Sequence, residues 1–233
     1  EADDRKVPLM GVLAAFVFAA QMINFAIPGT GSSGHLGGGM ILAILLGPYA
    51  AFLAMASVLV VQAFFFADGG LLALGCNIFN LGFFSCFIAY PLIYRRIVGV
   101  CPTQAKIFLG SVLAAVVGLQ LGSLSVVLQT FFSGISELPF KTFVLFMQPI
   151  HLAIGIAEGA LTAAVVIFVW KARPEILGVP IRSSRLSMEK ILIIFLGAAI
   201  LVGGVLSRWA SRQPDGLEWA ISRTSQRGVC GAE

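Results

Sequence analysis

Residues 142–170 read TFVLFMQPIHLAIGIAEGALTAAVVIFVW, an apolar stretch interrupted by few polar side chains. A helix rises about 1.5 Å per residue and the hydrocarbon core of a bilayer is about 30 Å thick, so this stretch can cross a membrane. It lacks the weak apolar–polar alternation of a membrane β-strand, and helices are the other element that can span lipid. We therefore expect a transmembrane helix here.

The rest of the chain repeats this pattern. The run 36–46 is short for a span and contains three glycines in succession, which leaves two alternatives, a half helix or a thinned or tilted span. The sequence predicts an all-α integral membrane protein, a bundle of about six or seven transmembrane helices. The other apolar runs cover residues 7–27, 49–67, 71–94, 107–132 and 189–206.

Composition supports a lipid environment. The chain has 233 residues, of which 58% are hydrophobic and 11% charged, whereas a soluble domain carries about 25% charged residues. This excludes a disordered tail, a collagenous chain and an ordinary cytosolic enzyme. The sequence has no GxxxxGK[ST], GxSxG or HExxH motif, so we expect neither ATP hydrolysis nor another enzymatic activity on this chain.

Basic residues predict the orientation of the helices. The connections 28–35, 68–70 and 133–141 hold one basic residue between them, Lys141. The positive-inside rule therefore places the other connections in the cytoplasm and turns 28–35, Asp68 and 208–233 outward. The basic residues of the inward connections are Arg5, Lys6, Arg95, Arg96, Lys106, Lys171, Arg173, Arg182, Arg185 and Lys190.

The first polar cluster, PGTGSSGHLGGGM at 28–40, lies at an outward connection. Glycines allow backbone to approach a bound atom closely, and they permit irregular backbone at membrane depth if it is buried in protein. His35 brings an imidazole, the commonest metal ligand. A lone histidine is often simply hydrogen-bonded, but the glycine-rich setting favours a metal ligand.

The second cluster, ADGGLLALGCNIFNLG at 67–82, begins at an outward turn with Asp68. Asn77 and Asn80 are three residues apart and share a helix face. Together with Ser33, these residues are candidates for a second shell that orients His35 or a metal-bound segment. Hydrogen bonding between helices is the equally weighted alternative for the two asparagines.

The third cluster, HLAIGIAEGALT at 151–162, contains His151 and Glu158. They are seven residues apart, two helical turns, so they project from one face about halfway through a span. They are candidates for a proton relay or for a buried polar pair that bridges to other helices.

Two Gly-xxx-Gly pairs, Gly118/Gly122 and Gly155/Gly159, lie inside long runs. Small residues at this spacing let helix backbones approach closely. They predict either packing within this chain or a ridge that docks a partner membrane protein.

The segments GSSGHLGGG (31–39), FADGGLLALGCNIFN (66–80) and PIHLAIGIAEGALT (149–162), in this order, resemble the CbiM/NikM family. These proteins are the substrate-capture (S) components of energy-coupling-factor (ECF) ABC transporters for cobalt and nickel. Further on, QPDGLEW (213–219) resembles the PDGLE segment of the small accessory component of the same transporters. The resemblance implies a CbiM/NikM-like membrane domain at 1–170, a cytoplasmic linker at 171–188, and a transmembrane helix with an incomplete extracytoplasmic PDGLE-like segment at 189–233.

The resemblance also implies a metal site. In the family, nitrogen ligands hold the ion near the outward face, and the histidine of the GxxGH segment matches His35. The other ligands come from a Met-His-Ile-Pro-Asp/Glu-Gly opening, which this chain does not contain. We therefore expect that one N-terminal helix of the natural protein is missing here. Nitrogen ligands suit late first-row divalent ions, so Ni²⁺ or Co²⁺ is the expected cargo, with no resident cofactor.

The family resemblance implies that energy comes from partners. These are a transmembrane coupling (T) component and two ATPase subunits, with a small accessory membrane component as a further candidate and no nucleic acid. The expected location is the cell membrane of a prokaryote. The alternative hypothesis is a stand-alone proton-coupled metal permease that uses His151 and Glu158.

Overall fold

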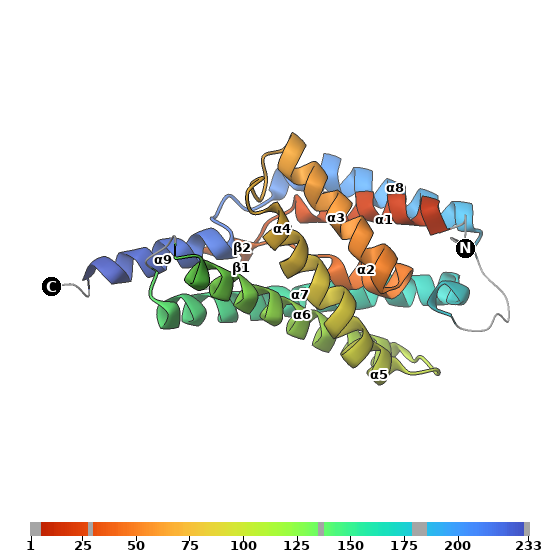
Figure 1. Cartoon of the computed structure of the whole chain (residues 1–233). Coiled ribbons are helices and arrows are strands. Elements are labelled where there is room, and N and C mark those ends of the chain that lie inside the picture. The colour runs from red at the N-terminus through yellow and green to blue at the C-terminus, as the bar shows by residue number, and fades with distance from the viewer. Residues whose placement is uncertain (1–5, 28–29, 135–137, 179–185, 231–233) are drawn as a thin grey trace.

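The computed structural model describes residues 6–27, 30–134, 138–178 and 186–230 (Figure 1). Within these ranges the chain is almost entirely helical, as predicted, and five helices are long and apolar enough to cross a membrane. A sixth, α1 (Lys6–Gln21), is apolar but shorter. The five are α3 (Pro48–Phe65), the continuous helix Leu74–Val98, α6 (Gln104–Ser133), α7 (Phe140–Ala172) and the segment Met188–Trp209.

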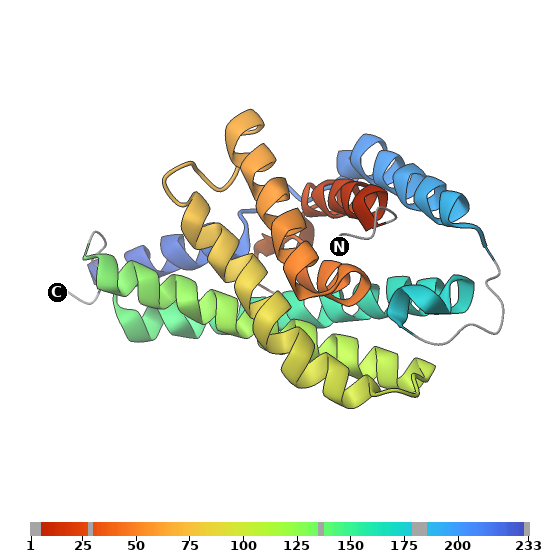
Figure 2. The same cartoon turned by 45° about the vertical axis from the view of Figure 1, so that its right-hand side comes forward.

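The continuous helix and the last span each combine several elements. The first joins α4 (Leu74–Asn77), η1 (Ile78–Tyr94) and α5 (Arg95–Val98), and η1 has wide turns with the hydrogen-bond spacing of a π-helix. The last span joins α8 (Met188–Gly204) to the 3₁₀ turn η3 (Leu206–Trp209). In Figures 1 and 2, α8 lies alongside α1, which is its main packing partner.

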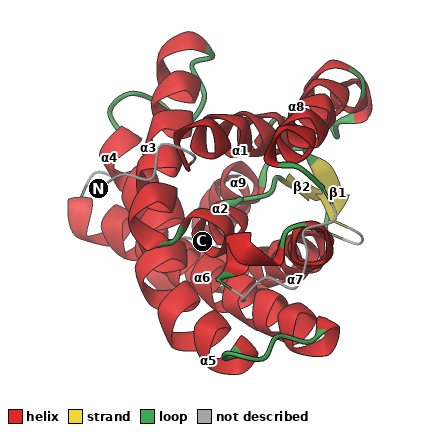
Figure 3. Cartoon of the chain, turned by 90° about the vertical axis from the view of Figure 1, so that its right-hand side faces the viewer, coloured by secondary structure: helices red, strands yellow, loops and turns green. Residues whose placement is uncertain are grey.

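The short run 36–46 forms α2 (Gly39–Leu46), and every one of its residues is buried. An eight-residue helix is about 12 Å long, too short to span, so the half-helix alternative is the one observed. Gly47 separates α2 from α3 and adopts φ 83°, a conformation that glycine takes without strain. Figure 3 looks along the bundle and shows α2 between the longer helices.

A small antiparallel hairpin, β1 (Phe25–Ile27) and β2 (Ser32–Gly34), follows α1 and was not predicted. Its register pairs Ala26 with Ser33. Three-residue strands leave no periodic signal in the sequence. The hairpin carries the glycine-rich segment from the end of α1 into the middle of the bundle.

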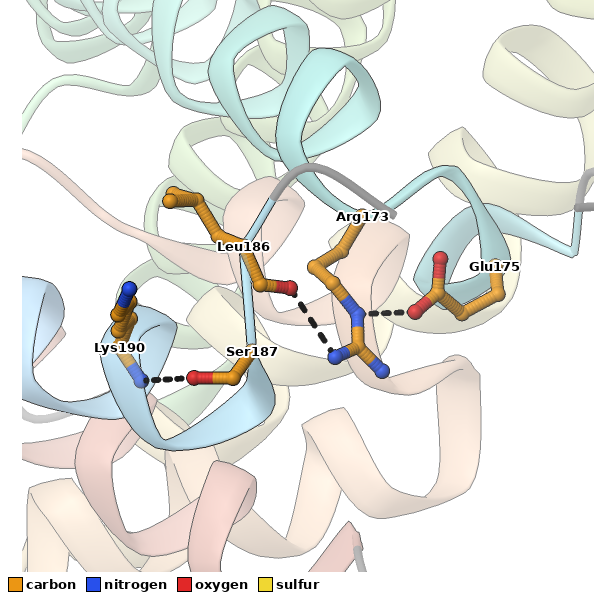
Figure 4. A network of polar contacts seen from close by, with 5 residues as sticks. All are labelled: Arg173, Glu175, Leu186, Ser187 and Lys190. Atoms are coloured by element: carbon orange, nitrogen blue, oxygen red, sulfur yellow. Dashed lines mark hydrogen bonds and ion pairs between the residues drawn. The ribbon is translucent and has the colours of Figure 1, made fainter. Parts of the chain in front are cut away.

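The predicted inward connections gather at one end of the bundle, on the right of Figure 1, where α1 and α8 begin and α7 ends. There Arg173 pairs with Glu175 of η2 (Pro174–Leu177), and its Nη1 donates to the Leu186 carbonyl at 3.2 Å (Figure 4). These contacts tie the end of α7 to the start of α8, where Ser187 caps the helix by accepting the Lys190 amide at 3.3 Å. Arg5, Arg182 and Arg185 lie outside the described residues.

Candidate metal centre

A cavity of about 320 Å³ lies at the predicted outward side of the bundle, and both histidines of the chain line it. His35 enters from the segment after β2, and His151 enters from α7. The cavity wall also includes three candidate residues of the second cluster, Asp68, Asn77 and Asn80. The three polar clusters that are separate in the sequence therefore meet around one space.

The two imidazoles are held in the same way. The Nδ1 atom of His35 pairs with the Leu36 carbonyl at 3.1 Å, and that of His151 pairs with the Met147 carbonyl at 2.8 Å. A carbonyl accepts, so these bonds assign Nδ1–H to both rings and leave Nε2 as the nitrogen with a lone pair. This tautomer is the one in which Nε2 can coordinate a metal.

His151 and Glu158 lie on one helix but are bonded to different groups. Glu158 is 1% exposed and accepts the Gly37 amide at 2.7 Å and the Gly38 amide at 3.1 Å. His151 instead bonds its own helix. The hydrogen bonds found for these two side chains join each of them to backbone groups. They do not join the two side chains to each other.

Asn77 and Asn80 line the cavity and form hydrogen bonds with neighbouring segments. Asn77 donates to the Gly69 carbonyl at 2.9 Å and so holds the turn after α3. Asn80 donates to Gln129 of α6 at 2.9 Å, and Gln129 returns a bond at 3.1 Å. The bonds found for these two side chains go to Gly69 and Gln129 and not to His35. The pair of bonds between Asn80 and Gln129 joins two helices, which agrees with the interhelical alternative for Asn80.

Ser33 connects the hairpin to the C-terminal segment. Its amide donates to the Pro214 carbonyl at 2.8 Å, and its hydroxyl donates to the Gln213 carbonyl at 2.7 Å. Asp215 lines the cavity and caps α9 (Gly216–Cys230) by accepting the Glu218 amide at 2.8 Å. The segment QPDGLEW, which lies beyond the last span in the sequence, therefore forms one wall of the cavity.

Sequence reasoning missed Gln21, the last residue of α1. Its amide nitrogen donates to the Gly37 carbonyl at 2.8 Å, and its oxygen accepts from Gln62 at 2.8 Å. A signal was present, because an amide at the end of an apolar run is a polar group near membrane depth, where it needs a partner.

The described side chains do not by themselves form a complete metal site. In the described ranges, no three His, Cys, Asp or Glu side chains converge as a group that could hold an ion. An ion bound at His35 would take its remaining ligands from backbone atoms, solvent or groups outside the described residues.

Gly216, in the docked C-terminal segment, lies close against α7. A Cβ atom there would lie 2.7 Å from Ile150 Cγ2 and 3.5 Å from His151 Cε1. We expect Gly216→Val to loosen this segment, because overpacking costs about 1–3 kcal/mol. Trypsin should then cut at Arg212 about tenfold faster, the change expected for about 1.4 kcal/mol. The matched control is Gly204→Val, since Gly204 has open space around it, and equal cleavage rates in the two variants would contradict the docking.

A helical membrane bundle with an imidazole-lined cavity at one side is suited to a class of protein, the multi-span transporters of transition-metal ions. The comparisons with known proteins identify the family within this class. The chain belongs to the CbiM family, because the cobalt uptake substrate-specific transmembrane region matches residues 1–176, and a PDGLE domain matches residues 189–232. This makes it a nickel or cobalt transport component of the membrane and a member of a transport family, not of an enzyme family.

Curated relatives agree with this assignment. A putative metal transport protein of Haloquadratum walsbyi is 40% identical over 81% of this chain and 84% of its own length. A putative fused nickel transport protein, NikMN, of Archaeoglobus fulgidus is 38% identical over 84% of this chain and 66% of its own length. The cobalt transport protein CbiM of Geobacter sulfurreducens is 30% identical over 93% of this chain, and this match spans 65% of that protein.

The fold is also similar to solved structures. A crystal structure of a transition metal transporter superposes with a TM-score of 0.63 at 30% identity, covering 73% of this chain and 78% of the other. A truncated transition metal transporter gives a TM-score of 0.61 at 30% identity, covering 72% and 82% of the two chains.

Proposed function

We propose that this chain is the substrate-capture component of an ECF-type importer for divalent nickel or cobalt in a prokaryotic cell membrane. The ion is held by nitrogen ligands near the outward face, with His35 as one of them. The observation that carries the proposal is the position of His35 on the cavity at the predicted outward side, with Nδ1 bonded to a carbonyl and the Nε2 lone pair left for an ion. The relatives named for nickel and cobalt transport support both cargoes equally.

Transport would be powered by partner subunits. A transmembrane coupling protein and two ATPases are the partners expected from the family, and a small accessory membrane component is a further candidate. The PDGLE-like segment at the cavity wall places a C-terminal element beside the proposed ion site.

Metal retention tests the ion site. We expect His35→Ala in the full-length protein to weaken nickel or cobalt binding by at least about tenfold, the lower end of what is lost when support for a metal site is removed. Metal content after purification and calorimetric titration measure the change. Ser57→Ala is the control, because Ser57 is exposed on α3 and does not line the cavity, so this variant should retain its metal. Unchanged metal content in His35→Ala would overturn the proposed site.

A further inference from the structure

Gly37, two residues after His35, has both of its backbone polar groups bonded to side chains of the surrounding helices. Its N–H, which belongs to the Leu36–Gly37 peptide, donates to Glu158 Oε2 of α7 at 2.7 Å. Its carbonyl, which belongs to the Gly37–Gly38 peptide, accepts from Gln21 Nε2 of α1 at 2.8 Å. Gln21 is itself bonded to Gln62 of α3, so side chains of three helices hold the backbone on both sides of the Gly37 Cα.

Glu158 also holds the next peptide. Its Oε1 accepts the Gly38 amide at 3.1 Å, so the two carboxylate oxygens bind two successive N–H groups just before α2 begins. Successive backbone amides are a favourable site for an anionic group, and a helix start adds to this attraction. Both oxygens act as acceptors, and a buried polar group satisfied in this way stabilises one backbone conformation.

The backbone has little room to respond if this bonding changes. Gly38 adopts φ 73°, and a Cβ there would lie 2.5 Å from Val17 Cγ1. A Cβ at Gly39 would lie 2.7 Å from Ser85 Cβ and 2.9 Å from the Leu81 carbonyl. The segment that follows His35 is therefore closely enclosed, and its position determines where the imidazole enters the cavity.

We infer that Glu158 is a positioning residue for the metal ligand His35 and acts through the Gly37 and Gly38 amides, with Gln21 holding the carbonyl of the Gly37–Gly38 peptide. This rests on the proposed function, since it takes His35 as a ligand. It gives Glu158 a role in affinity and geometry of the ion site, in place of a proton relay with His151.

The substitution Glu158→Gln tests this role with little change of shape. The glutamine side chain has one accepting oxygen, and its other polar atom belongs to an NH₂ group, which only donates. One of the two backbone N–H groups then faces this NH₂ group and loses its hydrogen bond. We expect about a 10–100-fold loss in Co²⁺ affinity, the range for outer-shell groups that orient a metal-binding histidine. We also expect a changed Co²⁺ visible absorption spectrum, because the ligand field depends on the direction of the imidazole.

Glu189→Gln is the matched control. Glu189 is exposed in the first turn of α8, so this variant removes the same charge away from the cavity, and its affinity and spectrum should equal those of the natural protein. A second variant, Gln21→Met, removes the donor to the Gly37 carbonyl. It should lower affinity in the same direction and tests the inference even if Glu158→Gln does not fold.

A double-variant cycle separates this inference from the proposed function. If Glu158 acts through His35, adding Glu158→Gln to His35→Ala should cause no further loss of Co²⁺ affinity. A folded Glu158→Gln protein with natural affinity and spectrum would overturn the inference while His35→Ala still loses metal. If His35→Ala itself binds Co²⁺ with natural affinity, the result contradicts the proposed function, on which the inference about Glu158 rests.

Discussion

Gly159→Ala is expected to destabilise the bundle by about 3 kcal/mol, at the upper end of the usual cost of overpacking. A Cβ at this position would overlap Val112 Cα and would lie 3.1 Å from the Val112 nitrogen and 3.2 Å from the Ser111 carbonyl. These are backbone atoms of α6, so no side-chain rotation relieves the contact. The two helices must move apart, and the packing between α6 and α7 is lost.

The matched control for Gly159→Ala is Gly197→Ala on α8. Gly197 also lies within a membrane helix, but a Cβ there meets no atom within 4 Å. Alanine favours helix over glycine by about 1 kcal/mol, so this variant should be neutral or slightly more stable. Unfolding in detergent, followed by circular dichroism, measures both. Equal stability of the two variants would contradict the close approach of α6 and α7.

The small-residue pairs therefore pack within this chain, one of the two alternatives that the sequence left open. Gly155 faces Val116 of α6, and Gly159 faces Val112. A Cβ at Gly122 would lie 2.6 Å from the Asn80 carbonyl oxygen of η1. The spacing predicted a close contact correctly, but the identity of the partner helix depends on tertiary structure that the spacing does not contain.

The helices were predictable because a membrane helix satisfies its own backbone, and its apolar length is visible in the sequence. The hairpin was not, because it depends on contacts between distant segments. The Ser33 hydroxyl bonds the Gln213 carbonyl, 180 residues away, and three-residue strands have no pattern of their own.

The candidate site, like the fold, was only partly predictable from the sequence. His35 could be selected by type, since imidazole is a rare metal-binding group in this chain, and the structure places it on the cavity. The shared face of His151 and Glu158 followed from helical spacing, but their hydrogen-bond partners did not. Glu158 bonds Gly37, 121 residues away, and such a pairing cannot be read from local sequence.

The second prediction concerns the source of energy for transport. The chain reconstituted alone in liposomes should give no metal accumulation under a pH gradient, whereas the complex with the proposed coupling protein and ATPases should accumulate Ni²⁺ or Co²⁺ when ATP is supplied. The physical reason is the bonding of Glu158. Both of its oxygens hold backbone amides, and the carboxylate is 1% exposed. A proton carrier must release and bind protons on the transport path, which here would break these bonds in every cycle.

Metal uptake into liposomes, measured with radioactive nickel or cobalt, tests this prediction directly. The complex with a non-hydrolysable ATP analogue should show uptake at background, and so should the complex that carries His35→Ala. Uptake driven by a pH gradient with this chain alone would support the proton-coupled permease that uses His151 and Glu158. If this uptake were lost in Glu158→Gln, the Glu158 carboxylate would take part in it, and its bonds to the Gly37 and Gly38 amides would have to change as the ion moves.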